Sequence, residues 1–121
     1  MQRLIKVTLF CLVLSSPFLP SEFLFGDTPL TITPGDYNGD GASDILWRDT
    51  SGNVAIGLMD GLSLTKGSTI ANIWTGWTIV GSGDFNGDGK ADILWRSIFG
   101  DVAIWLMDGV SITKSSTIAN I

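Results

Sequence analysis

The chain contains an internal repeat, and this repeat constrains its fold more than any other feature. Residues 36–73 and 84–121 align without a gap at an offset of 48 positions, and 27 of the 38 aligned pairs are identical. Such identity marks a duplicated structural unit, in which each copy buries its apolar surface against its neighbour. We divide the chain into a first repeat at 29–83 and a second, truncated repeat at 84–121, which has no counterpart of residues 74–83.

The repeats are predicted to consist of strands. Short apolar runs are separated by Asp, Asn and Gly at turn positions, and no segment shows a helical period of 3.6 residues. The predicted strands are 44–48, 54–59, 62–71 and 77–81 in the first repeat, and 93–96, 102–107 and 111–118 in the second. A four-stranded unit repeated about every 40–50 residues and packed face to face is typical of a β-propeller blade. We therefore expect an all-β protein of two four-stranded antiparallel blades, which form an incomplete propeller.

Each repeat opens with the pattern D-x-N-G-D-G-x-x-D, which predicts a metal-binding loop. Side-chain oxygens at positions 1, 3, 5 and 9 can converge if the loop curls tightly, and the Gly at position 6 permits that curl. A backbone carbonyl at position 7 can join them. Oxygen-only ligands, three of them carboxylates, favour Ca²⁺ over Mg²⁺. The predicted ligands are Asp36, Asn38, Asp40, Ala42 and Asp44 in the first loop, and Asp84, Asn86, Asp88, Lys90 and Asp92 in the second.

The alternative for these loops is an Asx/Gly turn that holds no metal. The same loop at the same position of both repeats favours the metal site. Electrostatic repulsion favours it too, because three carboxylates crowded into one loop repel one another unless a cation lies among them. The loop is not an EF-hand, since position 12, which requires a bidentate Glu, holds Trp47 and Trp95. A strand-forming sequence follows the loop, whereas a dockerin has a helix there.

These motifs resemble the FG-GAP/VCBS repeat family. The resemblance rests on GDFNGDGKADILWR at 83–96 and VAIWLMDG at 102–109, and it covers about residues 29–121. Repeats of that family form blades of β-propellers in integrin α-subunits, fungal lectins and secreted bacterial proteins. The resemblance implies Ca²⁺ on the loop that leads into the first strand of each blade. Two copies cannot close such a propeller, so we expect a truncated product, a fragment, or a protomer that assembles with others.

Composition excludes several classes of function. The net charge of −5 argues against binding to nucleic acid or to an anionic membrane, because both require clustered Lys and Arg. The chain has no His and a single Cys, Cys11, which excludes the usual zinc and haem ligand sets, His-based triads and an intrachain disulfide. Nearly every Asp is assigned to a loop or turn, and Glu22 is the only Glu. We therefore expect no catalytic activity.

The N-terminal residues differ from the rest of the chain. Arg3 and Lys6 precede the apolar run 7–14, which Ser15-Ser16-Pro17 ends. A basic segment, a short apolar core and small residues are typical of a secretory signal peptide, which we place at 1–26. The run is too short to span a bilayer. A buried N-terminal strand or helix and a lipoprotein signal at Cys11 are alternatives. We expect a secreted protein, extracellular or periplasmic.

The five tryptophans are predicted to be mainly core residues. Trp47 and Trp95 are expected to pack between blades, and Trp74 and Trp77 to belong to the core of the segment between the repeats. An alternative is that a tryptophan stacks on a sugar, and burial of Trp95 and Trp105 would argue against it. Trp105 stands where the first repeat has Gly57, so it can make a contact specific to one blade.

The two arginines that follow a repeat tryptophan, Arg48 and Arg96, are expected at solvated or Asp-paired strand ends. A clamp on a ligand carboxylate is the alternative.

Three functions remain open. The first is a secreted, calcium-binding propeller module for protein–protein adhesion or assembly, with homo-oligomers or a larger propeller assembly possible. The second is a lectin-like module that binds carbohydrate between blades. The third is a non-catalytic remnant or accessory domain of a larger secreted protein. A discrete oligomer would favour the first, because two isolated blades expose apolar faces and strand edges.

Overall fold

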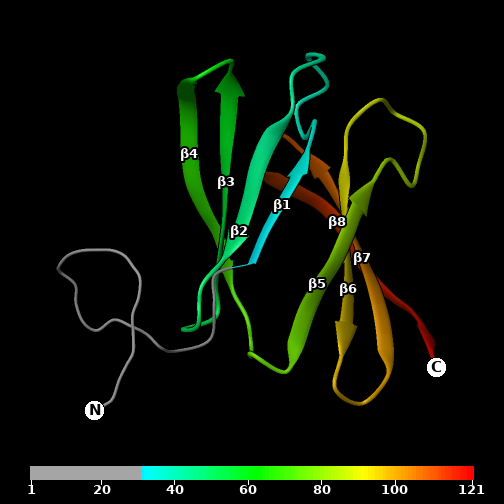
Figure 1. Ribbon diagram of the computed structural model, residues 1–121. Helices are drawn as coiled ribbons and strands as arrows, with labels where there is room; N and C mark the ends of the chain where they lie inside the picture. Colours follow the sequence, from blue (N-terminus) through cyan, green and yellow to red (C-terminus); the bar gives the residue numbers. More distant parts are fainter. Residues whose placement is uncertain (1–30) are drawn as a thin grey trace, which may run out of the picture.

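The computed structural model describes residues 31–121 and consists of strands joined by turns (Figure 1). The predicted signal peptide at 1–26 and the first two residues of the first repeat lie outside the described residues. The strands are β1 (Thr31–Gly35), β2 (Asp44–Arg48), β3 (Asn53–Asp60), β4 (Ser63–Asn72), β5 (Trp77–Gly83), β6 (Asp92–Ser97), β7 (Asp101–Asp108) and β8 (Ser111–Asn120).

The strands form two four-stranded antiparallel sheets, which confirms the predicted fold class. One sheet has the order β1-β2-β3-β4 and the other β5-β6-β7-β8. Within each sheet, each strand pairs with its neighbour in the chain. Short hairpins join the second, third and fourth strands, whereas the longer metal loop joins the first strand to the second. Even the irregularities repeat, because register shifts fall between Val54 and Ala55 in β3 and between Val102 and Ala103 in β7. Within residues 31–121 no helix could cross a membrane.

The boundary between the sheets differs from the predicted division of a blade. The strand predicted at 77–81 as the fourth strand of the first repeat is β5, which extends to Gly83, pairs with β6 and opens the second sheet. The equivalent first strand of the other sheet is β1, which the sequence signalled only by the weak similarity of 30–35 to 78–83. The second repeat was predicted to be truncated, but its sheet has all four strands, because the first of them lies before the metal loop.

The two sheets pack face to face around one apolar core, and the alternation of strand side chains decides which residues enter it. In β2, Asp44, Leu46 and Arg48 are buried, and the residues between them are half-buried. Leu46, Val54 and Ile56 of the first sheet and Ile93 of the second are fully buried in the same cluster. The near-continuous apolar runs of the sequence are explained by this arrangement, because each sheet has apolar residues on both faces.

Arg48 joins the two sheets and is not the solvated or Asp-paired residue that the sequence predicted. Its side chain is only 6% exposed. Nη1 donates to the carbonyl of Trp77 at 2.6 Å, and Nη2 donates to those of Ile73 and Trp74 at 3.0 Å. The guanidinium also lies 5.3 Å from the centroid of the Trp95 ring, a favourable cation–π geometry. Arg48 thereby fixes the segment that links β4 to β5 and holds it against the second sheet.

The tryptophans divide into buried and exposed positions. Trp95 is 1% exposed and packs between the sheets, as predicted. Trp77 is half-buried against the core cluster. Trp47 is half-buried, and its ring lies close to Gly57, where an added Cβ would come within 3.0 Å of it. The core prediction is wrong for Trp74, which is 54% exposed and stacks on Phe99 with 5.8 Å between ring centroids.

Replacement of Arg48 by methionine should destabilise the protein. Methionine keeps the aliphatic stem but leaves three part-buried carbonyls without their charged donor, and we expect a loss of about 2–3 kcal/mol in the free energy of unfolding. Arg96→Met is the matched control, because Arg96 is exposed and, within residues 31–121, its guanidinium donates to the carbonyl of Ile121 alone. We expect Arg96→Met to change stability by less than about 0.5 kcal/mol. Equal losses of both variants in urea-induced unfolding would contradict this role of Arg48.

Candidate metal centre

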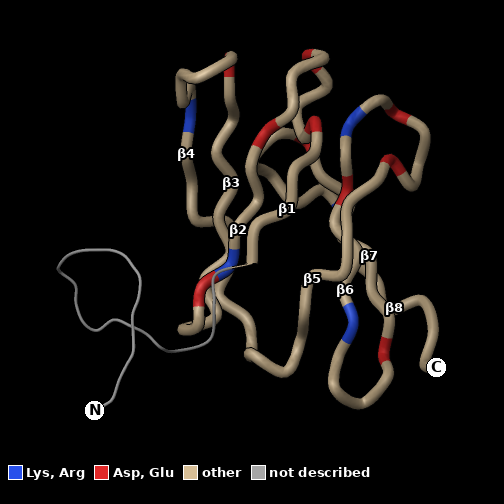
Figure 2. Tube along the Cα trace, viewed as in Figure 1, with Lys and Arg blue, Asp and Glu red and all other residues tan. Residues whose placement is uncertain are grey.

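The two predicted metal loops lie at the same end of the molecule. They connect β1 to β2 and β5 to β6, at the top of the view in Figure 1. In Figure 2 most acidic positions of residues 31–121 lie at this end of the tube. Asp49 directly follows β2 and Asp101 begins β7, so both lie at the hairpins of the opposite end. Both loops therefore concentrate negative charge where strands of the two sheets begin.

The second loop brings its three carboxylates together. One carboxylate oxygen from each of Asp84, Asp88 and Asp92 lies within 4.8 Å of the other two. Asp84 and Asp88 are exposed and Asp92 is buried. An ion placed among them would have both a buried and a solvent-facing side, so that water could complete its coordination shell.

The loop is held in shape by backbone amides that donate to Asp84. Gly87 donates to Oδ1 and Gly89 to Oδ2, each at 2.8 Å, and Asp88 donates to Oδ1 at 3.1 Å. Donation from the Gly89 amide, followed by those of Asp88 and Gly87, lowers the pKa of Asp84. This carboxylate is therefore kept ionised and fixed at the head of the loop.

The carboxylates at position 9 of the loops are fully buried. Asp44 and Asp92 are each 0% exposed. Asp92 accepts hydrogen bonds from the amides of Phe85 and Met107, both at 2.9 Å, and so connects the loop to β7. Asp44 makes the equivalent bonds to Tyr37 and Met59. A buried carboxylate needs partners that offset its charge, and a cation would supplement these neutral amides.

The first loop repeats these bonds and also contacts the second sheet. Asp36 accepts from Gly39 and Gly41 at 2.8 Å, as Asp84 does from Gly87 and Gly89. The carbonyl of Asp36 accepts from the amide of Ala91, and that of Tyr37 accepts from the amide of Gly109, both at 2.7 Å. The first loop therefore forms part of the interface between the sheets, and any ion that orders it also orders this interface.

The remaining predicted ligands lie in the same loops. Asn38 and Asn86 donate through Nδ2 to Asp40 at 3.3 Å and to Asp88 at 3.4 Å. The amides of Ala42 and Lys90 each donate at 2.9 Å to Oδ1 of the Asp at position 5. Their carbonyls as ligands stay a prediction. The side chain of Lys90 lies 4.0 Å from Asp108 rather than among the loop carboxylates.

The donor set fits a hard cation. All its side chains offer oxygen, and within residues 31–121 the one cluster of three metal-ligating acidic side chains is that of Asp84, Asp88 and Asp92. Ca²⁺ accepts such mixed sets of carboxylate, amide and carbonyl oxygens, and it tolerates irregular geometry. Asp84, Asp88 and Asp92 would hold the ion in the second loop. Asp36, Asp40 and Asp44 occupy the equivalent positions of the first loop, but among residues 31–121 only the second loop brings its three carboxylates together.

Comparison with known proteins identifies the family of the repeat. Residues 36–95, which include both loops, match the family described as FG-GAP-like repeat. This segment belongs to that family, which confirms the resemblance to FG-GAP/VCBS repeats. No curated protein and no solved structure matches the chain. FG-GAP-like repeats are generally non-catalytic.

A second concave site, which the sequence did not predict as a unit, lies on the second sheet beside the segment that links β4 to β5. A cavity of about 560 Å³ is lined by Trp74, Trp77, Trp95 and Trp105 and by the hydroxyl-bearing residues 115–117. The rings of Trp95 and Trp105 are 4.8 Å apart, and Nε1 of buried Trp95 has no hydrogen-bond partner. The only sequence signal for this cavity was Trp105 in place of Gly57.

Glycine at position 6 of the second loop should be required for its shape. Gly89 has a φ of +85°, and nothing lies within 4 Å of an added Cβ, so Gly89→Ala introduces backbone strain without a clash. We expect a loss of about 1 kcal/mol in the free energy of unfolding. Gly81→Ala, which also has open space but no left-handed backbone, is the matched control and should be nearly neutral. Equal effects in urea-induced unfolding would contradict the proposed strain.

Proposed function

We propose that the protein is a secreted, calcium-binding repeat module whose role is adhesion or assembly with other proteins. The observation that carries this proposal is the meeting of Asp84, Asp88 and Asp92 oxygens within 4.8 Å in a loop of the FG-GAP-like repeat. Extracellular calcium modules have dissociation constants of about 10⁻⁴–10⁻³ M, which suits a compartment rich in calcium. The predicted signal peptide supports the same location.

In this proposal calcium acts as a structural element. Asp84 directly follows β5 and Asp92 begins β6, so an ion bound to both fixes the connection between these strands. Asp92 also accepts from Met107, which extends the effect to β7. In the first loop the carbonyls of Asp36 and Tyr37 accept from the second sheet, so an ion there stabilises the packing of the two sheets.

Removal of calcium should lower the melting temperature. At a calcium concentration ten times the dissociation constant, each site contributes about 1.4 kcal/mol, or about 6–10 °C for a domain of this size. The double variant Asp40→Asn/Asp88→Asn should lose most of this effect, because each amide removes one negative ligand. Differential scanning calorimetry with calcium and then with a chelator measures both shifts.

Asp60→Asn is the matched control for that experiment. Asp60 is the exposed last residue of β3, outside both loops, so its variant should respond to calcium as the wild type does. Identical melting curves of the wild type with calcium and with chelator would overturn the calcium proposal. A calcium response retained in full by the double variant would overturn the assignment of the ligands.

A role other than catalysis fits the chemistry of the described residues. The acidic residues at equivalent positions of the two loops accept backbone hydrogen bonds. Asp49 does so in a hairpin, where hydrogen bonds from the side chain and amide of Asn53 lower its pKa. These contacts suit structural carboxylates rather than a general acid, which needs a raised pKa. An accessory domain of a larger secreted protein is compatible with the same chemistry.

The tryptophan-lined cavity favours carbohydrate binding as a second candidate function. Its volume lies in the range of small-molecule sites, and aromatic faces combined with hydroxyl groups suit a sugar ring. Burial of Trp95 argues against that side chain as a stacking platform. Half-buried Trp105 and exposed Trp74 remain accessible.

Sugar binding can be tested by tryptophan fluorescence. Titration with a panel of neutral and N-acetylated monosaccharides should shift the emission of the wild type if the cavity binds sugar. Trp105→Ala should abolish the shift, whereas Trp47→Phe, outside the cavity lining, should retain it. Absence of any response across the panel at millimolar sugar would overturn the carbohydrate candidate.

A further inference from the structure

Each sheet has two apolar faces that the repeat makes alike. We call the face of the first sheet that packs on the second sheet its forward face, and the opposite face its backward face. The repeat-equivalent faces of the second sheet take the same names. In the internal interface, the forward face of the first sheet therefore packs on the backward face of the second sheet. The forward faces carry Leu46, Arg48, Val54, Ile56 and Leu58 in the first sheet and Leu94, Arg96, Val102, Ile104 and Leu106 in the second. The backward faces carry Ile45, Trp47, Ala55 and Met59 in the first sheet and Ile93, Trp95, Ala103 and Met107 in the second.

The forward face of the second sheet is uncovered. Tyr37 is 0% exposed beside the second sheet, whereas its repeat equivalent Phe85 is 47% exposed. Ile70 is half-buried against the core, whereas its equivalent Ile118 is 57% exposed. A hollow of about 250 Å³ on this face is lined by Phe85, Ile118 and neighbouring residues of β7 and β8. The side chains that form an interface in the first sheet therefore have no cover in the second.

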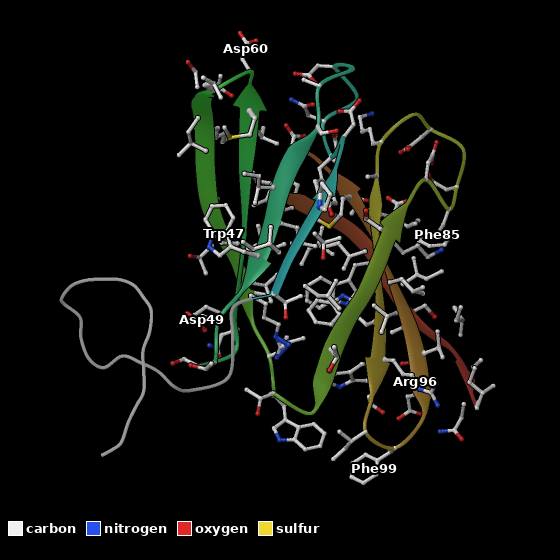
Figure 3. The ribbon with its side chains drawn as sticks, in the orientation of Figure 1. Trp47, Asp49, Asp60, Phe85, Arg96 and Phe99 are labelled. Atoms are coloured by element: carbon white, nitrogen blue, oxygen red, sulfur yellow. The ribbon has the colours of Figure 1, made fainter. Side chains whose placement is uncertain are left out.

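The backward face of the first sheet is uncovered in the same way. Val110 packs against the core between the sheets, whereas its repeat equivalent Leu62 is fully exposed at 102%. Trp95 is 1% exposed, whereas its equivalent Trp47 is half-buried. Trp47 and Phe85 lie on opposite sides of the pair of sheets in Figure 3. The molecule thus exposes one half of its internal interface on each side.

We propose that a second copy of this chain docks its backward face, around Trp47 and Leu62, on the forward face around Phe85 and Ile118. The internal interface is the template for this contact. Within the chain, Gly109 donates to the carbonyl of Tyr37 and Ala91 to that of Asp36, both at 2.7 Å. Between copies, the equivalent bonds join Gly61 and Ser43 of one chain to Phe85 and Asp84 of the other.

The contact is head-to-tail, because it joins two different faces. Such a heterologous interface generates a closed ring if the rotation between copies closes, and a filament if it does not. One difference from the internal interface is Gly57 in place of Trp105, so the contact between copies loses one aromatic ring. The inference rests on the proposed function, because the calcium ion proposed for the second loop orders the loop that presents the carbonyls of Asp84 and Phe85 to the second copy.

The two faces can be tested separately by sedimentation velocity on the full chain with calcium. The wild type should associate as its concentration rises from micromolar to submillimolar. Ile118→Asp blocks the forward face, and Leu62→Asp blocks the backward face. Each variant alone should remain monomeric, because every copy then lacks the same face. Both positions are exposed in a single chain, so neither variant should unfold. Ile98→Asp, at an exposed position in the β6–β7 hairpin, should associate like the wild type.

Mixing the two blocked variants gives the decisive result. Each retains the face that the other has lost, so an equal mixture should form a dimer and nothing larger. A wild type that stays monomeric, a mixture that stays monomeric, or oligomers that persist in both variants would overturn the proposal. Calorimetry with calcium and chelator on the same samples reports on metal binding. A wild type that does not associate but keeps its calcium response refutes the docking alone, and a wild type with no calcium response refutes the proposed function.

Discussion

The packing of one sheet on the next is the interaction on which the rest of this structure depends. Arg48 is buried at that interface, where it donates to three carbonyls of the linking segment and lies over Trp95. Its equivalent Arg96 is exposed because no sheet covers the forward face of the second sheet. The same residue type is therefore a structural clamp or a surface charge according to whether a neighbouring sheet is present.

The metal loops and the interface between sheets form one mechanical unit. Asp36 organises the first loop with its carboxylate and contacts the second sheet with its carbonyl. Asp44 and Asp92 are buried where the loops enter the sheets, so that each loop is bonded to the third strand of its own sheet. An ion in these loops would stabilise strand connections and sheet packing together, which is the role we propose for calcium.

Much of the fold could be predicted from the sequence, because the repeat fixes both the strands and their order. The strand at 44–48 was predicted with the bounds of β2, and the two loops stand where the acidic pattern placed them. Pairing between strands was less accessible, since the segment at 77–83 gives no local signal of which sheet it joins. Arg48 was misjudged for a similar reason: its burial depends on carbonyls 25–29 residues away in the chain.

The central claim is that the loops bind calcium, and diffraction from crystals grown with calcium tests it most directly. The account predicts anomalous difference density in both loops, with carboxylate oxygens of Asp84, Asp88 and Asp92 about 2.3–2.6 Å from the peak in the second. Equivalent density is expected among Asp36, Asp40 and Asp44. Loops of the same shape that hold only water at millimolar calcium would contradict the account.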